Sequence, residues 1–166
     1  MLWLLPILLI SQVIPTFAIA PLLVIWLGYG MSSKIATTAI MLFFPITSAF
    51  FDGLRHTHPD LVDLARTMNA KKWRFFWHIR IPAALPYFAS GLRIAVIAAP
   101  ISAVIGEWVG ASHGLGFLML NANARMQIDL MFAALATLTL FSLLLYYITI
   151  VLLKKMIPWQ NEAKAL

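Results

Sequence analysis

The chain has 166 residues, of which 62% are hydrophobic and 11% charged, and its mean hydropathy is +0.90. A soluble domain of this size does not bury so much apolar surface, so the composition excludes an ordinary soluble protein and predicts one that lies in a bilayer. The formal charge is +6, but the basic residues lie in loops between apolar runs. This distribution favours an inner-membrane protein over one that binds nucleic acid.

The first apolar stretch, residues 1–28, contains no charged residue. As a straight helix at 1.5 Å per residue it would exceed a hydrocarbon core of roughly 30 Å, so we expect it to tilt, kink or break. Pro6, Pro15 and Pro21 mark the places where this happens most easily. A signal peptide is the competing interpretation, but no basic segment precedes the apolar run. We therefore predict a membrane span.

A short turn at residues 29–34 separates this stretch from a second predicted span at residues 35–51. The second span carries Pro45 and is long enough to cross the hydrocarbon core. Two antiparallel spans are therefore expected before the central loop.

The one long polar and basic passage of the chain is the central loop, residues 52–88. Its first part predicts a short amphipathic helix with Pro59 in the first turn and an apolar stripe at i, i+3, i+4 and i+7. The residues of this stripe are Leu61, Leu64, Ala65 and Met68. Asn69 tolerates the left-handed backbone conformation, so we expect it to close the helix.

The second part of the central loop is cationic and aromatic, from Lys71 to Trp77, and ends in Ile79, Ile81 and Pro82. This mixture of residues is typical of a membrane interface. The apolar stripe that precedes it has two interpretations, a helix lying flat on the lipid surface or a helix docked into a groove of a protein partner.

A third span is predicted at residues 89–108, with Arg93 near its start and Glu107 near its end. Residues 110–116 are too rich in glycine for a helix and predict a turn, and residues 117–124 favour a short helix lying against the bundle. Residues 130–153 form the fourth predicted span. The expected fold class is therefore an all-α membrane protein, a polytopic helical bundle of about four spans.

The basic residues predict the orientation of this bundle. Seven of the 12 Lys and Arg residues lie in or beside the central loop, and Lys154, Lys155 and Lys164 follow the fourth span. Two spans separate these regions, so both lie on one side, which the positive-inside rule makes cytoplasmic. The turns at residues 29–34 and 109–129 then face outward. Residues 159–166 are expected to form a cytoplasmic tail.

The central loop resembles the cytoplasmic coupling loop of binding-protein-dependent ABC importer permeases. That pattern is Glu-Ala-Ala, three residues, Gly, nine residues and Ile-x-Leu-Pro. With every spacing kept, this chain places at those positions Asp63, Leu64, Ala65, Asn69, Ile79, Ile81 and Pro82. Asp keeps the charge of Glu on a shorter arm, and Asn is the next-best residue after Gly for a left-handed cap. The matched spacing favours docking of the amphipathic helix into a protein groove.

The resemblance runs from about Gln12 to Trp159 and implies the transmembrane domain of a type I ABC importer, here over residues 1–158. It implies a multi-pass permease subunit of the bacterial inner membrane that passes a small polar solute delivered by a binding protein. The implied partners are cytoplasmic ABC ATPase subunits, an extracytoplasmic binding protein and a second permease copy, as a homodimer. The residues implied to meet the ATPase are Leu61, Asp63, Leu64, Ala65, Met68, Asn69, Ile79, Ile81 and Pro82.

The sequence itself indicates that the energy for transport comes from a partner. It contains no G-x-x-x-x-G-K-[ST] motif, and residues 110–116 lack the lysine that a phosphate-binding loop requires. No carboxylate lies deep in a predicted span, where an ion-coupled carrier would need one. The spans also lack a nucleophile–base pair or a cluster of metal ligands, so an enzyme, a cofactor site and a metal site are not expected.

Two polar residues on the expected outer side are candidates for the transport pathway. An ionisable group at membrane depth is costly and usually has a role, which favours Glu107 as a gate or cavity residue. The alternative is an interfacial carboxylate, solvated or paired with Arg125. Asn121 either lines an outer vestibule or is a polar position on an exposed short helix.

Permeases of this family typically carry further spans before the matched region, so we expect this chain to be short at its N-terminus. A truncated, non-transporting membrane remnant is the alternative to a working subunit. The segments APLLVIWLGYG and GEWVGAS most resemble the permeases for thiamine pyrimidine precursors, which makes such a pyrimidine the expected cargo. Sulfonate or taurine and nitrate are the alternatives.

Overall fold

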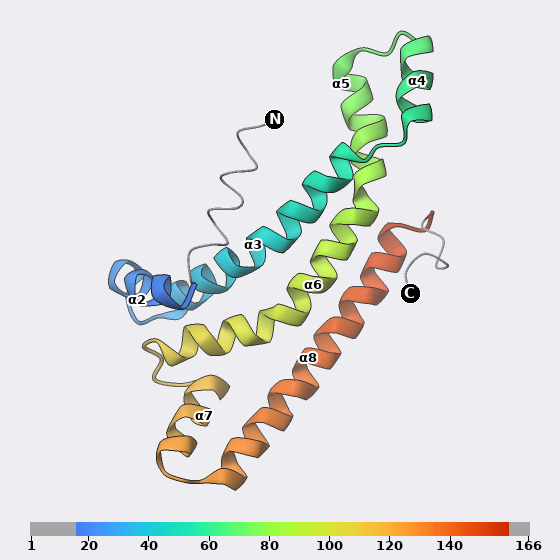
Figure 1. Ribbon diagram of the computed structural model, residues 1–166. Coiled ribbons are helices and arrows are strands. Elements are labelled where there is room, and N and C mark those ends of the chain that lie inside the picture. Colours follow the sequence, from blue (N-terminus) through green and yellow to red (C-terminus); the bar gives the residue numbers. More distant parts are fainter. Residues whose placement is uncertain (1–15, 160–166) are drawn as a thin grey trace.

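The computed structural model describes residues 16–159, and all regular structure in this range is helical (Figure 1). Its elements in chain order are α2 (Thr16–Leu27), α3 (Met31–Arg55), α4 (Pro59–Thr67), α5 (Lys72–Phe75), the π-helical turn η1 (Phe76–Arg80), α6 (Ile81–Trp108), α7 (Leu115–Ala124) and α8 (Ile128–Met156). The all-helical fold expected from the sequence is confirmed over the described residues.

Three helical segments in the described range are long and apolar enough to cross a membrane: Met31–Arg55, Lys72–Trp108 and Ile128–Met156. They contain the expected spans at residues 35–51, 89–108 and 130–153. The first expected span, residues 1–28, is described only from residue 16, where α2 forms an apolar helix of 12 residues. Residues 1–15 and 160–166, which belong to the expected first span and tail, lie outside the described residues.

The central loop is more helical than its polar composition indicates. Helix α3 continues to Arg55, and α5, η1 and α6 follow one another without a break from Lys72. The π-helical turn comes just before Pro82, which has no N–H to offer the carbonyl oxygen of His78 four residues earlier. A change in the hydrogen-bond ladder is expected there, and η1 takes it up, with the N–H of Ile81 bonded to the carbonyl of Phe76.

Helices α3 and α6 pack against each other at small residues. A Cβ atom on Gly91 would lie 2.6 Å from both the Ala49 Cβ and the Pro45 carbonyl oxygen. A Cβ atom on Gly53 would lie 2.7 Å from the Tyr87 Cβ. Close backbone approach at glycine is the usual basis of helix packing in a bilayer, where the hydrophobic effect does not drive helices together.

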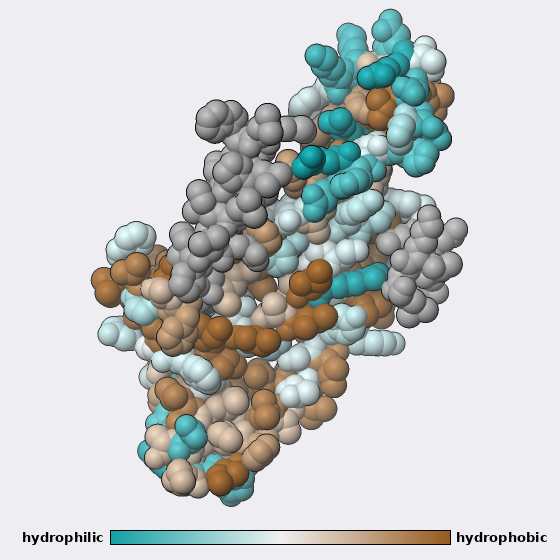
Figure 2. Space-filling model, viewed as in Figure 1, coloured by the Kyte–Doolittle hydropathy of each residue, from teal (hydrophilic) through white to brown (hydrophobic). Residues whose placement is uncertain are grey.

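Helix α8 packs against both α6 and α7, and near its C-terminal end Leu153 and the following residue Ile157 are buried against Ala89. Many of its large apolar side chains remain exposed, including Leu140 and Phe141, as suits a lipid-facing helix. Figure 2 shows hydrophilic residues gathered over α4 and α5, with hydrophobic residues concentrated away from that end. The polar end is the one that the distribution of Lys and Arg predicts to be cytoplasmic.

Candidate functional site

Helix α4 begins and ends as its sequence predicts. Pro59 stands in the first turn, where its missing N–H has no partner to lose, and Asp60 lies near the positive end of the helix dipole. Asp63 pairs with Arg66 at 3.3 Å on the exposed side of the helix. Such exposed pairs contribute about 0–1 kcal/mol, so this one does little to hold α4 in place.

The C-terminus of α4 turns at Asn69, whose φ of 50° is left-handed as expected. The N–H of Ala70 bonds to the carbonyl of Ala65, and the N–H of Asn69 bonds to that of Arg66, both at 3.0 Å. These two bonds form a Schellman motif, which satisfies carbonyls that the helix end would otherwise leave free. The chain is thereby reversed sharply between α4 and α5.

The apolar stripe of α4 is divided between the inside and the outside of the molecule. Ala65 is only 4% exposed, whereas Leu61, Leu64 and Met68 are 39%, 54% and 73% exposed. Helix α4 also makes few contacts with the other helices. Three large apolar side chains on one short helix are therefore left uncovered by the described part of the chain, at the end of the molecule where Figure 2 shows hydrophilic residues gathered.

The remaining residues of the expected coupling loop lie apart from this stripe. Ile79 is in η1, and Ile81 and Pro82 form the first turn of α6, where all three are half-buried. Nearby, the exposed rings of Trp73 and Trp77 have centroids 5.6 Å apart. The structure thus divides the sequence-predicted site into an exposed helix and a partly buried junction that joins it to α6.

Glu107 lies at the other end of α6 and contacts the start of α7. Its Oε2 atom accepts a hydrogen bond of 2.6 Å from the N–H of Gly116. The ion pairs found within residues 16–159 do not include one between Glu107 and Arg125. In this structure Glu107 therefore bonds to the backbone of Gly116 and does not form the salt bridge with Arg125 that was one of the expected alternatives.

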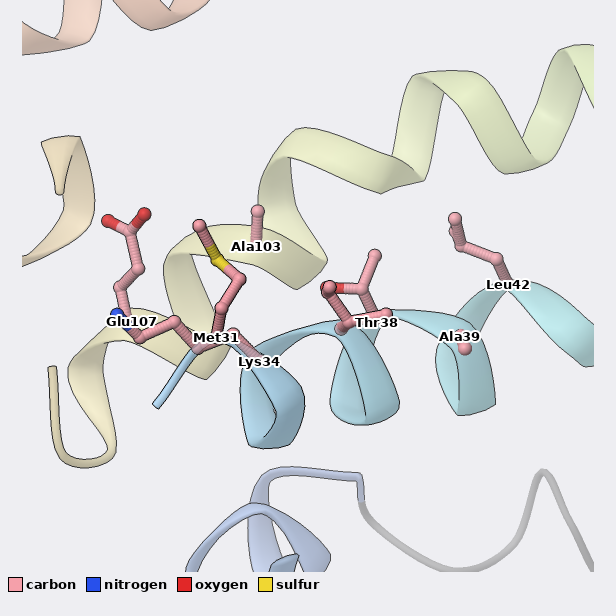
Figure 3. Close-up of a pocket in the computed structure, with 8 residues that line it drawn as sticks. Met31, Lys34, Thr38, Ala39, Leu42, Ala103 and Glu107 are labelled. Atoms are coloured by element: carbon pink, nitrogen blue, oxygen red, sulfur yellow. The ribbon is translucent and has the colours of Figure 1, made fainter. Parts of the chain in front are cut away.

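Glu107 also lines a cavity of about 360 Å³ between α3 and α6. Figure 3 shows Met31, Lys34, Thr38, Ala39 and Leu42 following one another along α3 beside this cavity, with Ala103 and Glu107 contributed by α6. A second groove of about 380 Å³ shares Thr38 and Ala103 and continues to α8. Its walls are almost entirely apolar.

Asn121 lies on α7 and donates from Nδ2 to the Phe117 carbonyl at 3.0 Å. Its amide is thus engaged by its own helix, and it is not among the residues that line the two cavities. Sequence reasoning missed Gly116 and Trp108, whose Nε1 donates to the Gly116 carbonyl at 3.1 Å. The sequence signal for this contact was a pair of polar side chains, Glu107 and Trp108, directly before a glycine-rich turn.

Comparison with known proteins matches residues 2–160 to the family described as binding-protein-dependent transport system inner membrane component. A probable ABC transporter permease protein of Haemophilus influenzae is 62% identical over 144 residues, which cover 87% of this chain and 59% of that protein. The formylaminopyrimidine transport permease protein ThiX of Halalkalibacterium halodurans is 39% identical over 157 residues, 95% of this chain and 63% of that protein.

The taurine transport system permease protein TauC of Escherichia coli is more distant, at 28% identity over 159 residues, which cover 96% of this chain. The match covers 58% of TauC. The chain therefore spans about three fifths of the length of the relatives it matches (59%, 63% and 58%).

Proposed function

Because the chain belongs to the family of binding-protein-dependent inner-membrane transport components, we propose that it forms the pathway of an ATP-driven importer for a small polar solute. Its helices lie in the inner membrane, and it takes its energy from a separate ATPase subunit. A binding protein delivers the solute on the outer side. A second copy of the permease completes the pathway, and the exposed apolar grooves beside α3, α6 and α8 supply surface for that pairing.

The observation that carries this proposal is the uncovered stripe of α4. Leu61, Leu64 and Met68 present apolar surface at the polar end of the molecule, on a helix that is closed at Asn69 and makes few contacts of its own. A short amphipathic helix with anchors at this spacing fits an apolar groove of a protein partner. The continuous segment from Lys72 to Trp108 connects this docking helix to the membrane-crossing region.

For the cargo, we propose a pyrimidine precursor of thiamine. The relative named for formylaminopyrimidine transport is 39% identical, whereas the one named for taurine transport is 28% identical. This difference favours the pyrimidine over a sulfonate. Uptake of labelled formylaminopyrimidine and of labelled taurine, with and without this gene, separates the two cargoes, and absence of gene-dependent uptake of formylaminopyrimidine contradicts the proposed cargo.

The docking of α4 is tested by Leu64→Glu. A carboxylate buried in an apolar groove without a partner costs several kcal/mol, so this variant should lose the ATPase on co-purification from membranes while remaining inserted. Arg66→Glu is the matched control, because it places the same carboxylate on the polar side of the same helix. If Leu64→Glu retains the ATPase and its substrate-stimulated ATP hydrolysis, α4 is not the coupling element.

A further inference from the structure

One turn of α6 holds the start of α7 at a single residue. Glu107 accepts the N–H of Gly116 at 2.6 Å, and Trp108 donates to the carbonyl oxygen of the same residue at 3.1 Å. A Cβ atom on Gly116 would lie 3.0 Å from the Cα of Val104. Positions 104, 107 and 108 fall on one face of a helix, at i, i+3 and i+4. Both backbone polar groups of Gly116 are therefore bonded by that face of α6.

The turn before α7 is shaped to bring this contact about. Gly114 has a φ of 125°, a conformation that residues with side chains rarely adopt. A Cβ atom there would collide with the carboxyl group of Glu107. Glycine at both 114 and 116 thus leaves space for the carboxylate to reach the first turn of α7, where free N–H groups and the positive end of the helix dipole favour an acceptor.

We propose that Glu107 and Trp108 are positioning residues that fix α7 to the outer end of α6. In this assignment the carboxylate of Glu107 serves as the acceptor for the Gly116 N–H. Transport then requires this hydrogen bond and does not require a contact between Glu107 and the cargo. The effect of this contact on transport rests on the proposed function. In that function α4 binds the ATPase, and α6 is connected to α4 through η1 and α5. Displacement of α6 then carries α7 with it on the outer side.

The contact itself is tested by hydrogen–deuterium exchange on the full chain in lipid nanodiscs, followed over the first turn of α7. Glu107→Ala removes the acceptor and should speed exchange of the Gly116 amide by on the order of 10- to 100-fold. Glu107→Gln keeps an acceptor oxygen but loses the charge near the helix dipole, so the increase should be only about two- to fivefold. Asp129→Asn, which neutralises an exposed carboxylate in the first turn of α8, should change nothing here.

Two exchange results would overturn the assignment: a protected Gly116 amide in Glu107→Ala, or a Gln variant that exchanges as fast as the Ala variant. Trp108→Phe replaces the indole by a smaller aromatic ring and removes the N–H that bonds the Gly116 carbonyl, and because that bond is between neutral groups the variant should loosen the same turn by less than Glu107→Ala. This milder variant keeps the test valid where Glu107→Ala fails to fold.

The consequence for transport is tested by the ratio of binding-protein-stimulated to basal ATP hydrolysis in the assembled complex. Glu107→Ala should lower this ratio and Glu107→Gln should restore it. A Gln variant with a protected amide and no stimulation would overturn the assignment, because it would show that transport needs the charge. Wild-type protein that shows no stimulation, together with the expected exchange pattern, would refute the proposed function and support the contact.

Discussion

Helices α4 and α7 are short, lie at opposite ends of the continuous segment from Lys72 to Trp108, and end in the same way. After α7, Met126 has a φ of 55°, and the N–H groups of Met126 and Gln127 bond to the carbonyls of Asn123 and Ala122 at 3.1 Å and 2.9 Å. After α4, the left-handed residue is Asn69 with a φ of 50°. The two helix ends thus share one hydrogen-bond pattern.

The surroundings of the two helices differ. Within the described residues α4 buries only Ala65, whereas α7 buries Gly116 and Ala122 and packs against both α6 and α8. The same local hydrogen bonds therefore close a helix that the described residues leave exposed in one case and a helix that they cover in the other. Substitutions in α7 should act on the stability of the chain, and those in α4 on assembly.

The largest effect is expected at Gly116. Gly116→Val places a branched side chain 3.0 Å from the Val104 Cα, and overpacking of this kind typically costs about 1–3 kcal/mol. The temperature of unfolding in detergent should fall by about 2–4 °C for each kcal/mol. Asn123→Val introduces the same residue on an exposed position of α7 and is the control. Equal unfolding temperatures for the two variants would show that α7 is not closely packed.

An intermediate effect is expected at Asn69. A left-handed conformation costs a residue with a side chain about 1–2 kcal/mol, and a β-branched one tolerates it worst, so Asn69→Val should reduce co-purification of the ATPase. Asn69→Gly should retain it, since glycine adopts this conformation without strain. Neither variant should shift the unfolding temperature of the membrane-embedded helices. If Asn69→Val lowered the unfolding temperature as much as Gly116→Val, α4 would be as important for the stability of the chain as α7.

The smallest effect is expected at Met126, and it is stabilising. Met126→Gly relieves the left-handed strain at an exposed position and should raise the free energy of unfolding by about 0.5–1 kcal/mol. Met126→Leu retains the strain and should leave the unfolding temperature unchanged. A loss of stability in the glycine variant would mean that the Met126 side chain makes contacts that outweigh its backbone strain.

The parts of this structure that the sequence predicts depend on neighbours a few residues apart. The left-handed turn at Asn69 follows from one residue type after an amphipathic run, and it is confirmed. The short helix expected at residues 117–124 is found as Leu115–Ala124, so it begins two residues inside the glycine-rich segment 110–116 that was predicted as a turn. The long apolar runs give α3, α6 and α8 in the same way.

Features that depend on distant residues were not predictable. The burial of Ala65 within an otherwise exposed stripe requires knowledge of how α4 sits, which its own periodicity does not contain. The contact between Glu107 and Gly116 depends on the path of the intervening turn. The composition of residues 71–82 predicts a segment at the membrane interface, and that prediction does not contain the continuous helical path from Lys72 through η1 into α6.

Helices α3 and α6 are joined along their whole common length and not at one crossing point. A Cβ atom added at Gly53, Gly91 or Gly106 would lie 2.7 Å from the Tyr87 Cβ, 2.6 Å from the Ala49 Cβ and 3.5 Å from the Lys34 Cα. Close backbone approach at both ends and in the middle leaves neither helix free to pivot on the other. A displacement of α6 that starts next to α4 should therefore carry α3 with it.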